Sequence, residues 1–313
     1  MTEKTLEETV DERPVVLKVD HVAKMFRLPT EQATGLKMAF LNWTKGIKGY
    51  TEQHVLRDIN FEVHQGDFFG IVGRNGSGKS TLLKIFAGLE TPDTGFVTLD
   101  GQPITGPGPD RGIVFQGYML FAWKNVRDNV ELGLKLRNIP ANERHEIAQH
   151  YIDMVGLTGF EKHYPHQLSG GMKQRVGIAR ALIMNPKLII ADECISALDV
   201  SIQAQVVNLM KDIQQETGTA YLFIAHDLSM VKYISDRIGV LHLGHLLETG
   251  TTEEIFEHPI HPYTRSLLSA IPLPNPVVEK RRVAETYDYA TSGIDYSKGT
   301  ATMVRQPLRQ VHG

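Results

Sequence analysis

The chain has 313 residues, 42% of them hydrophobic, and a formal net charge of −3 at pH 7. This is enough for one large domain or two smaller ones, and the charge balance gives no overall basic surface to attract nucleic acid. No apolar run reaches the roughly 18 residues that span a bilayer, and the acidic start MTEKTLEETVDER is unlike a signal peptide, so we expect a soluble, cytosolic protein. A single cysteine, Cys194, excludes an internal disulfide.

The first third of the chain has the pattern of β-strands. Residues 1–14 are expected to form an acidic tail, and apolar and polar residues then alternate over 15–26 and again over 55–63. Between these two predicted strands, residues 36–50 form an apolar and basic insertion with the character of a short helix. GFVTLDG and GIVFQ, further along, indicate two more strands.

Helical and buried-strand patterns follow. From about 117 to 175 apolar residues recur every three or four positions, which predicts a helical subdomain. The apolar runs LIIADE (188–193) and YLFIAH (221–226) are typical of strands buried on both faces of a parallel sheet, with a crossover helix between them. Periodicity fades after about residue 270, so we expect one main domain over 15–270 and a C-terminal extension over 271–313.

A glycine-rich stretch, GRNGSGKS (73–80), lies between the apolar run FFGIV and the helical pattern TLLKIFAGL. It fits the phosphate-binding pattern G-x-x-x-x-G-K-[ST], in which glycines let backbone N–H groups and the helix start face a phosphate chain. A plain turn would require neither the lysine nor the serine. The predicted nucleotide-binding residues are Gly73, Arg74, Asn75, Gly76, Ser77, Gly78, Lys79, Ser80 and Thr81.

Two carboxylates end the predicted buried strand at 188–193. Beside a phosphate-binding loop, the first, Asp192, is expected to hold Mg²⁺, and the second, Glu193, to polarise a water molecule in line with the γ-phosphate. Acids are common at strand ends, so it is the loop that makes this pattern informative.

The stretch LSGGMKQRVGIARAL (168–182) places Ser169, Gly170 and Gly171 at the start of a helix expected to run to Asn185-Pro186. It resembles the signature sequence of ATP-binding cassette (ABC) ATPases. The resemblance implies an α/β P-loop fold of ABC type, with a mixed or parallel sheet core, an antiparallel β subdomain and a helical subdomain. It also implies that the helix start contacts ATP held by a second ATP-binding subunit, in a homo- or heterodimer.

Further stretches resemble other parts of the same family. Gln116 stands where the Q-loop glutamine is expected, SALD (196–199) resembles the D-loop, and His226 resembles the switch histidine. Phe26 is the match for the residue that stacks on adenine, with Tyr50 as a rival. The resemblance thus implies ATP and Mg²⁺ as cofactors, catalytic roles for Lys79, Gln116, Glu193 and His226, and Ser80, Gln116 and Asp192 as metal ligands.

Two residues depart from the family pattern. Met172 ends the signature where glutamine is commoner, which removes one polar contact and leaves the anion site undisturbed. Cys194 follows Glu193 where proline is usual, and we interpret it as a small buried apolar residue rather than a redox sensor.

Different segments resemble different branches of the family. Residues 20–86 are similar to ATPases of polysaccharide and teichoic-acid exporters, 87–182 to nitrate and sulfonate importers, and 183–288 to oligopeptide and dipeptide importers. The signature has the importer style and HPYT follows the cassette, so we predict peptide import. The alternatives are a polysaccharide or teichoic-acid exporter, a nitrate or sulfonate importer, and an ABC ATPase outside transport.

The resemblance also implies transmembrane permease subunits as partners, at the cytoplasmic face of the membrane, and no nucleic acid. In the family the membrane subunit docks close to the Q-loop, which here is followed by GYMLFAWKNV (117–126). The dense group of Met119, Leu120, Phe121 and Trp123 is therefore expected at the docking surface, with packing inside the domain as the alternative.

Overall fold

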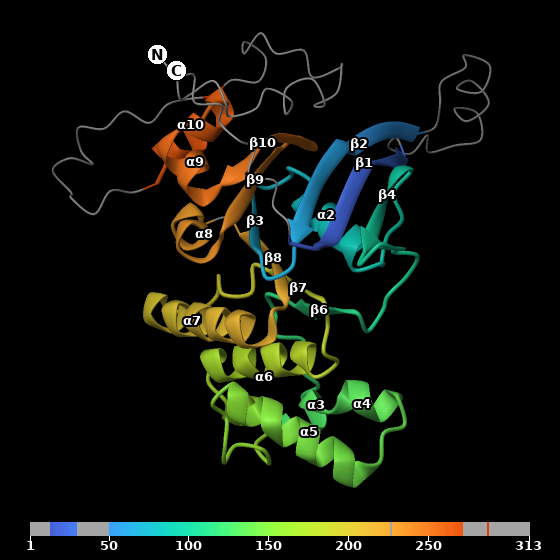
Figure 1. The fold of residues 1–313 in the computed structure, drawn as a ribbon, viewed down its shortest axis with the longest axis vertical. Helices are drawn as coiled ribbons and strands as arrows, with labels where there is room; N and C mark the ends of the chain where they lie inside the picture. Colours follow the sequence, from blue (N-terminus) through green and yellow to red (C-terminus); the bar gives the residue numbers. More distant parts are fainter. Residues whose placement is uncertain (1–12, 30–49, 226, 272–286, 288–313) are drawn as a thin grey trace, which may run out of the picture.

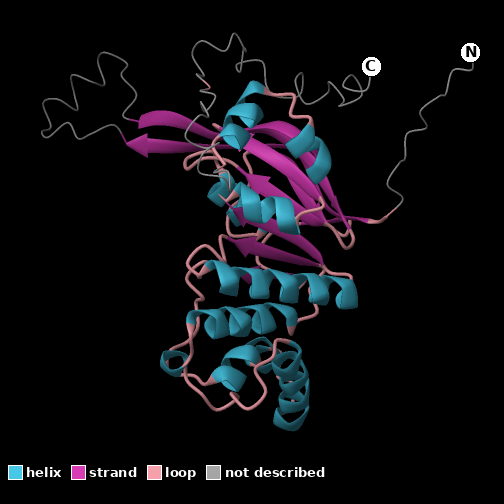
Figure 2. Ribbon diagram, turned by 90° about the vertical axis from the view of Figure 1, so that its left-hand side faces the viewer, coloured by secondary structure: helices cyan, strands magenta, loops and turns pink. Residues whose placement is uncertain are grey.

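The computed structural model describes residues 13–29, 50–225, 227–271 and 287. Two β-sheets occupy one end of the molecule and a group of helices, α3 to α6, the other (Figure 1). The same division is visible from the side in Figure 2, where the helical end has no strands.

The first sheet is antiparallel, in the order β2-β1-β4-β5. Leu17 is fully buried and pairs with Val63 on one side and Leu99 on the other, so the apolar side of the alternating pattern faces inward. The predicted strands over 15–26 and 55–63 are confirmed, and both are longer. Tyr50 belongs to a strand rather than to the expected helix, of which residues 36–49 lie outside the described residues. The strands are β1 (Val15–Pro29), β2 (Tyr50–His64), β4 (Thr94–Leu99) and β5 (Gln102–Pro103).

The second sheet has six strands in the order β10-β9-β3-β8-β7-β6. All neighbouring pairs are parallel except β9 and β10, which form an antiparallel hairpin. Every residue of β3 and β8 is buried, as continuous apolar runs predict for strands covered on both faces. The strands are β3 (Phe68–Val72), β6 (Arg111–Val114), β7 (Leu188–Asp192), β8 (Ala220–Ala225), β9 (Arg237–His242) and β10 (His245–Thr251).

One face of this second sheet packs against α2 and the antiparallel sheet, and the other face packs against helices that include α7 and α8. In the described part of the chain no helix is both long and apolar enough to cross a bilayer. The signature helix, α6, ends at Leu182, three residues before the expected Asn185, which has a left-handed φ of 50°. The helices are α2 (Lys79–Phe86), α3 (Val126–Val130), α4 (Leu132–Leu136), α5 (Ala141–Met154), the 3₁₀ helix η1 (Pro165–Gln167), α6 (Gly170–Leu182), α7 (Val200–Thr217), α8 (Leu228–Ile234), α9 (Thr252–Glu257) and α10 (Pro262–Ser269).

An aromatic contact joins the two sheets through α2. The ring of Phe61 in β2 stacks on Phe69 of β3, with centroids 4.9 Å apart, and meets Phe86 of α2 edge-on at 5.9 Å. All three side chains are buried, and burial of aromatic rings is among the largest stabilising contributions in a core. The antiparallel sheet is thereby packed onto the helix that follows the glycine-rich loop.

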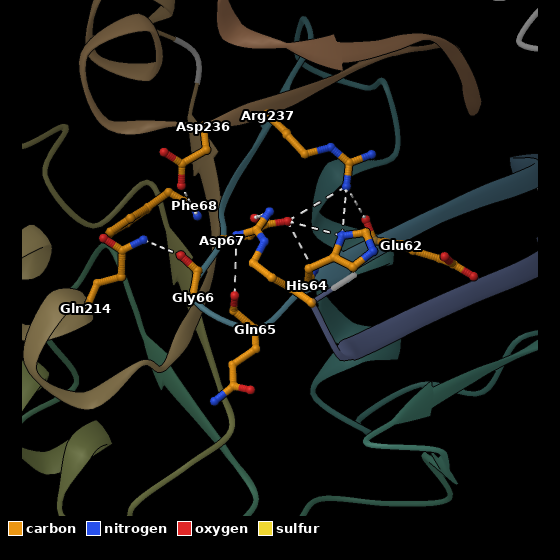
Figure 3. Close-up of polar contacts among 10 residues, drawn as sticks. Glu62, His64, Gln65, Gly66, Asp67, Phe68, Gln214, Asp236 and Arg237 are labelled. Carbon is orange, nitrogen blue, oxygen red and sulfur yellow. Dashed lines mark hydrogen bonds and ion pairs between the residues drawn. The ribbon is translucent and has the colours of Figure 1, made fainter. Parts of the chain in front are cut away.

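The turn before β3 is organised by Asp67, which is fully buried (Figure 3). Its carboxylate accepts a hydrogen bond from the His64 N–H (3.0 Å) and pairs with Arg13 at 2.7 Å and Arg237 at 3.7 Å. Its carbonyl accepts the Tyr221 N–H of β8 at 2.7 Å. A buried carboxylate is tolerated when it is paired and hydrogen-bonded in this way, and the turn sets where β3 begins between β8 and β9.

Candidate functional site

The glycine-rich loop connects β3, which ends at Val72, to α2, which begins at Lys79. Gly78 has a φ of 105°, a region that residues with a Cβ rarely adopt, and a Cβ there would lie 2.8 Å from the Val55 carbonyl of β2. A Cβ at Gly73 would meet the Leu241 carbonyl of β9. The loop is therefore held tightly between β2 and β9, and only glycine fits at these two positions.

Lys79 is the first residue of α2, and 6% of its surface is exposed. Its ammonium donates hydrogen bonds to the carbonyls of Gly73 and Arg74, the latter at 3.2 Å. Burial lowers the pKa of Lys79, and the carboxylates of Glu193 and Asp192 act in the opposite direction. The Lys79 ammonium thus interacts electrostatically with the two carboxylates at the end of β7.

Asp192 and Glu193 come to this place because β7 and β3 lie on either side of β8, so that their carboxyl ends meet at one edge of the sheet. Burial raises the pKa of Asp192, the Glu193 charge raises it further, and Lys79 lowers it. Glu193 has a left-handed φ of 42°, and its N–H donates to the Ile224 carbonyl of β8 at 2.9 Å. The carboxylates of Asp192 and Glu193 and the ammonium of Lys79 therefore influence one another's ionisation, as is typical of groups in functional sites.

The described residues enclose a cleft of about 540 Å³ over this loop. Seven of the nine predicted nucleotide-binding residues line it, together with Glu193; Gly73 and Arg74 contribute through their carbonyls to Lys79. Residues that the sequence patterns did not indicate complete the lining: Gln53, His54, Val55 and Arg57 from β2, and Leu243 from the β9–β10 turn. No spacing rule points to them, because β2 reaches the loop only through the packing of the two sheets.

Gln116 follows β6 and is exposed. Its amide nitrogen donates to the Ser196 hydroxyl at 3.1 Å, and that hydroxyl donates to the Glu193 carbonyl at 2.8 Å. The structure therefore joins the predicted Q-loop residue to the predicted catalytic acid through one serine.

The signature residues lie at the start of α6. Ser169 is the N-cap, and its hydroxyl accepts a hydrogen bond from the Met172 N–H at 3.3 Å. A Cβ at Gly171 would lie 2.6 Å from the Ile202 side chain of α7, and one at Gly170 would lie 3.0 Å from the Tyr118 hydroxyl. Among the described residues, neither Ser169 nor the two glycines line the cleft formed by the same chain.

The remaining predicted site residues are either absent from the described lining of the cleft or outside the described residues. Phe26 pairs with Gln53 in the first sheet, and the Lys24 ammonium lies 5.4 Å from its ring centroid. The Arg27 guanidinium lies 4.9 Å from the Tyr50 centroid. Neither aromatic residue is among the described residues that line the cleft, so which one stacks on adenine stays a prediction. His226 lies outside the described residues.

Cys194 is fully buried, and burial raises the pKa of its thiol to about 12. A thiol with so high a pKa is protonated at neutral pH and unreactive. The interpretation of Cys194 as a small buried apolar residue is confirmed.

Comparison with known proteins agrees with this geometry. The family described as ABC transporter matches residues 56–196, and the region described as the oligopeptide/dipeptide transporter C-terminal region matches 247–293. Over 81% of its length the chain is 46% identical to the oligopeptide transport ATP-binding protein OppF of Streptococcus mutans, covering 86% of that protein. It is 43% identical to the dipeptide transport ATP-binding protein DppF of Lactococcus lactis, covering 81% of this chain and 85% of that protein.

Solved structures lead to the same class. CbiO1 from Clostridium perfringens, part of an ABC transporter complex, superposes with a TM-score of 0.65 and 27% identity over 78% of this chain and 92% of that one. The ATP-binding cassette MJ0796, a dimer bound to ADP and Pi, superposes with a TM-score of 0.62 and 29% identity over 75% of this chain and 98% of that one.

The chain belongs to the ABC transporter family. It is an ATPase of the ABC type and it binds ATP, so the predictions of family, fold class and enzyme activity are confirmed. The alignment with the Streptococcus mutans relative covers 81% of the chain. The similarity to this peptide transport ATP-binding protein therefore extends beyond the segment 183–288.

Proposed function

We propose that the chain is the ATP-hydrolysing subunit of an importer of oligopeptides or dipeptides. The observation that carries the hydrolytic part is the group formed by buried Lys79 and the carboxylates of Asp192 and Glu193 at one edge of the sheet, with the glycine-rich loop beside it. The names of the relatives from Streptococcus mutans and Lactococcus lactis, and the match over 247–293, support peptides as cargo.

The site residues have distinct roles in this proposal. Backbone N–H groups of the loop and the Lys79 ammonium bind the phosphates, and Glu193 polarises the attacking water. Gln116 is hydrogen-bonded to Ser196, which is hydrogen-bonded to the Glu193 carbonyl. In this proposal these bonds couple the position of Glu193 to the docking of a membrane subunit on the neighbouring segment 117–126. His226 is proposed to hold the γ-phosphate, as its position after β8 suggests.

Magnesium fits the donors that the chain offers. Ser80, Gln116 and Asp192 supply hydroxyl, amide and carboxylate oxygens, the ligand type that Mg²⁺ prefers. The Gln116 amide nitrogen is used in the bond to Ser196, which leaves its oxygen for a cation. Burial and the nearby Glu193 charge both raise the pKa of Asp192, and a divalent cation at this place would favour the charged carboxylate. When bound, the ion neutralises charge on the β- and γ-phosphates.

The functional unit is proposed to contain two ATP-binding subunits. Ser169, Gly170 and Gly171 lie at a helix start, where unpaired N–H groups favour an anion, and outside the described lining of their own chain's cleft. ATP held by a second subunit is the ligand that this placement suits. The dimeric cassette MJ0796 supports the arrangement.

A mixing experiment tests the dimer. Lys79→Ala and Ser169→Arg chains, each inactive alone, should form heterodimers with one intact and one doubly damaged site, and part of the ATPase activity should return. Proven heterodimers without any activity would contradict either contact in trans or independent turnover at the two sites, and an active Ser169→Arg homodimer would remove Ser169 from the site.

Transmembrane permease subunits are the proposed further partners, with the chain at the cytoplasmic face of the membrane and no nucleic acid bound. Purification of the tagged full chain from its native membranes should recover these subunits. Cells lacking the chain should lose uptake of a labelled tripeptide and keep uptake of its free amino acids, and Lys79→Ala should not restore it. Normal tripeptide uptake without the chain would refute peptide import.

A further inference from the structure

A cluster of aromatic and imidazole rings lies behind the glycine-rich loop. We call His242, His261, Tyr263 and Tyr287 the histidine–tyrosine cluster. The Tyr263 ring lies 4.0 Å from His242, centroid to centroid, and Tyr287 lies 5.5 Å from Tyr263 and 5.6 Å from His242. The cluster brings the start of α10 to the end of β9, beside the loop.

Tyr263 is held firmly in this cluster and is only 1% exposed. Its N–H donates to Nδ1 of His261, the N-cap of α10, at 3.0 Å. The buried carboxylate of Glu248 in β10 accepts the N–H groups of Ile260 and His261 at 2.8 and 3.1 Å. The start of α10 is thereby tied to β10, and the Tyr263 ring has little freedom to move.

The Tyr263 hydroxyl reaches the loop itself. It accepts a hydrogen bond from the backbone N–H of Arg74 at 3.3 Å, across 189 residues of sequence. The same peptide group carries the Gly73 carbonyl, which accepts the Lys79 ammonium. A peptide unit is planar, so its N–H and C=O point in opposite directions and turn together. Holding the N–H of this unit therefore aims its carbonyl at Lys79.

The second carbonyl of the loop supports the same geometry. The Arg74 carbonyl accepts the Lys79 ammonium at 3.2 Å and the Ser77 N–H at 3.1 Å. On the opposite flank, the Gly244 N–H of the β9–β10 turn donates to the Ser77 carbonyl at 2.9 Å. The β9–β10 hairpin and α10 thus contact the loop on opposite sides. The segment 247–293 contains α10 and most of β10.

We propose that Tyr263 is a positioning residue for ATP binding, which acts by orienting the Gly73–Arg74 peptide and, through it, Lys79. This inference rests on the proposed function of the loop as the ATP site. It makes the C-terminal segment a determinant of ATP affinity in this chain, in addition to any role in cargo transport.

The test compares two isosteric changes in the full chain. Tyr263→Phe keeps the ring and removes the hydroxyl, and the loss of one hydrogen bond should raise the Kd and KM for ATP about 2- to 12-fold with little change in kcat. Tyr221→Phe is the matched control, because Tyr221 is also fully buried and its hydroxyl has no hydrogen-bond partner among the described residues. That variant should bind ATP as the wild type does.

Amide hydrogen exchange gives a readout that does not depend on activity. Without nucleotide, the segment 73–79 should exchange faster in Tyr263→Phe than in Tyr221→Phe, while exchange in the rest of the chain stays the same. Unchanged ATP affinity and exchange in Tyr263→Phe would overturn the proposal, and so would faster exchange spread over the whole chain instead of centred on 73–79, which would indicate a purely structural role. A wild-type chain that binds no ATP would refute the proposed function instead.

Discussion

Gln116 donates a hydrogen bond to Ser196 at 3.1 Å, although 80 residues separate them in sequence. The same serine hydroxyl donates to the Glu193 carbonyl at 2.8 Å, and Glu193 has an unfavourable left-handed φ of 42°. The Gln116 side chain is therefore connected to the backbone of the proposed catalytic acid through a single hydroxyl group. These hydrogen bonds link the segment 117–126, which follows Gln116, to Glu193 in the cleft.

Ser196→Ala should break this connection. Losing one hydrogen bond that positions Glu193 should reduce kcat about 2- to 12-fold and leave the Kd for ATP unchanged. Ser269→Ala is a suitable control, because the Ser269 hydroxyl likewise donates to a carbonyl three residues earlier at 2.8 Å, at the end of α10. Equal kcat values for the two variants would show that the connection carries no function.

Glu193→Gln should separate binding from hydrolysis. The amide cannot polarise water, so ATP turnover should fall by about 100-fold or more, and an ATP-bound dimer should accumulate because the loop and Asp192 remain. Lys79→Ala, in contrast, should weaken ATP binding together with the rate, since it removes the loop's cation. Steady-state ATPase assays and size-exclusion chromatography with ATP measure both. Turnover near the wild-type rate in Glu193→Gln would rule out this role.

Trp123 is 74% exposed and Met119 is 60% exposed, whereas Leu120 packs against the core. Trp123 therefore does not fill the domain interior, although its ring lies 5.4 Å from that of Phe121. If it contacts a transmembrane subunit, Trp123→Ala should weaken that association by about 1–3 kcal/mol, with basal ATPase activity and thermal stability unchanged. Phe96→Ala, an exposed aromatic residue in β4, serves as the control. Equal pull-down of the membrane subunits by both variants would place docking elsewhere.

Stability should fall in mild acid because His245 and His261 are buried near the loop and His242 is partly buried there. Burial, with smaller effects of Arg74 on His242 and of Arg57 on His245, lowers their pKa and that of His261 to about 4 from the ordinary 6.5. The unfolded chain therefore binds protons between pH 6.5 and 4 that the folded chain does not, so their contribution is complete above pH 6.5 and is lost as pH falls.

The free energy of unfolding should drop by at most about 1.4 kcal/mol per pH unit for each histidine across that window. Urea titrations at pH 7.5 and 5.5 measure the drop. His261→Asn keeps a residue type that caps helices and should make the drop smaller. An identical pH dependence in this variant would mean that His261 titrates normally.

Local chemistry made part of this protein predictable. The loop over 73–80 and the acids that end β7 could be located because strand, turn and helix follow one another directly in the chain, so spacing alone determines which groups face a phosphate. The same holds for Ser169, which caps α6 as a serine before two glycines suggests. The buried strands β7 and β8 follow from continuous apolar runs.

Contacts between distant segments were decided by tertiary packing. Gln53, His54 and Arg57 line the cleft only because β2 lies against the loop, in a register with β1 that shifts at several points and that no local pattern encodes. The Tyr263 hydroxyl can accept the Arg74 N–H because contacts with Glu248 and His242 hold the start of α10 next to the loop. The local sequence determines which loop can bind an anion. The residues that surround and support that loop depend on how buried surfaces far apart in the chain pack together.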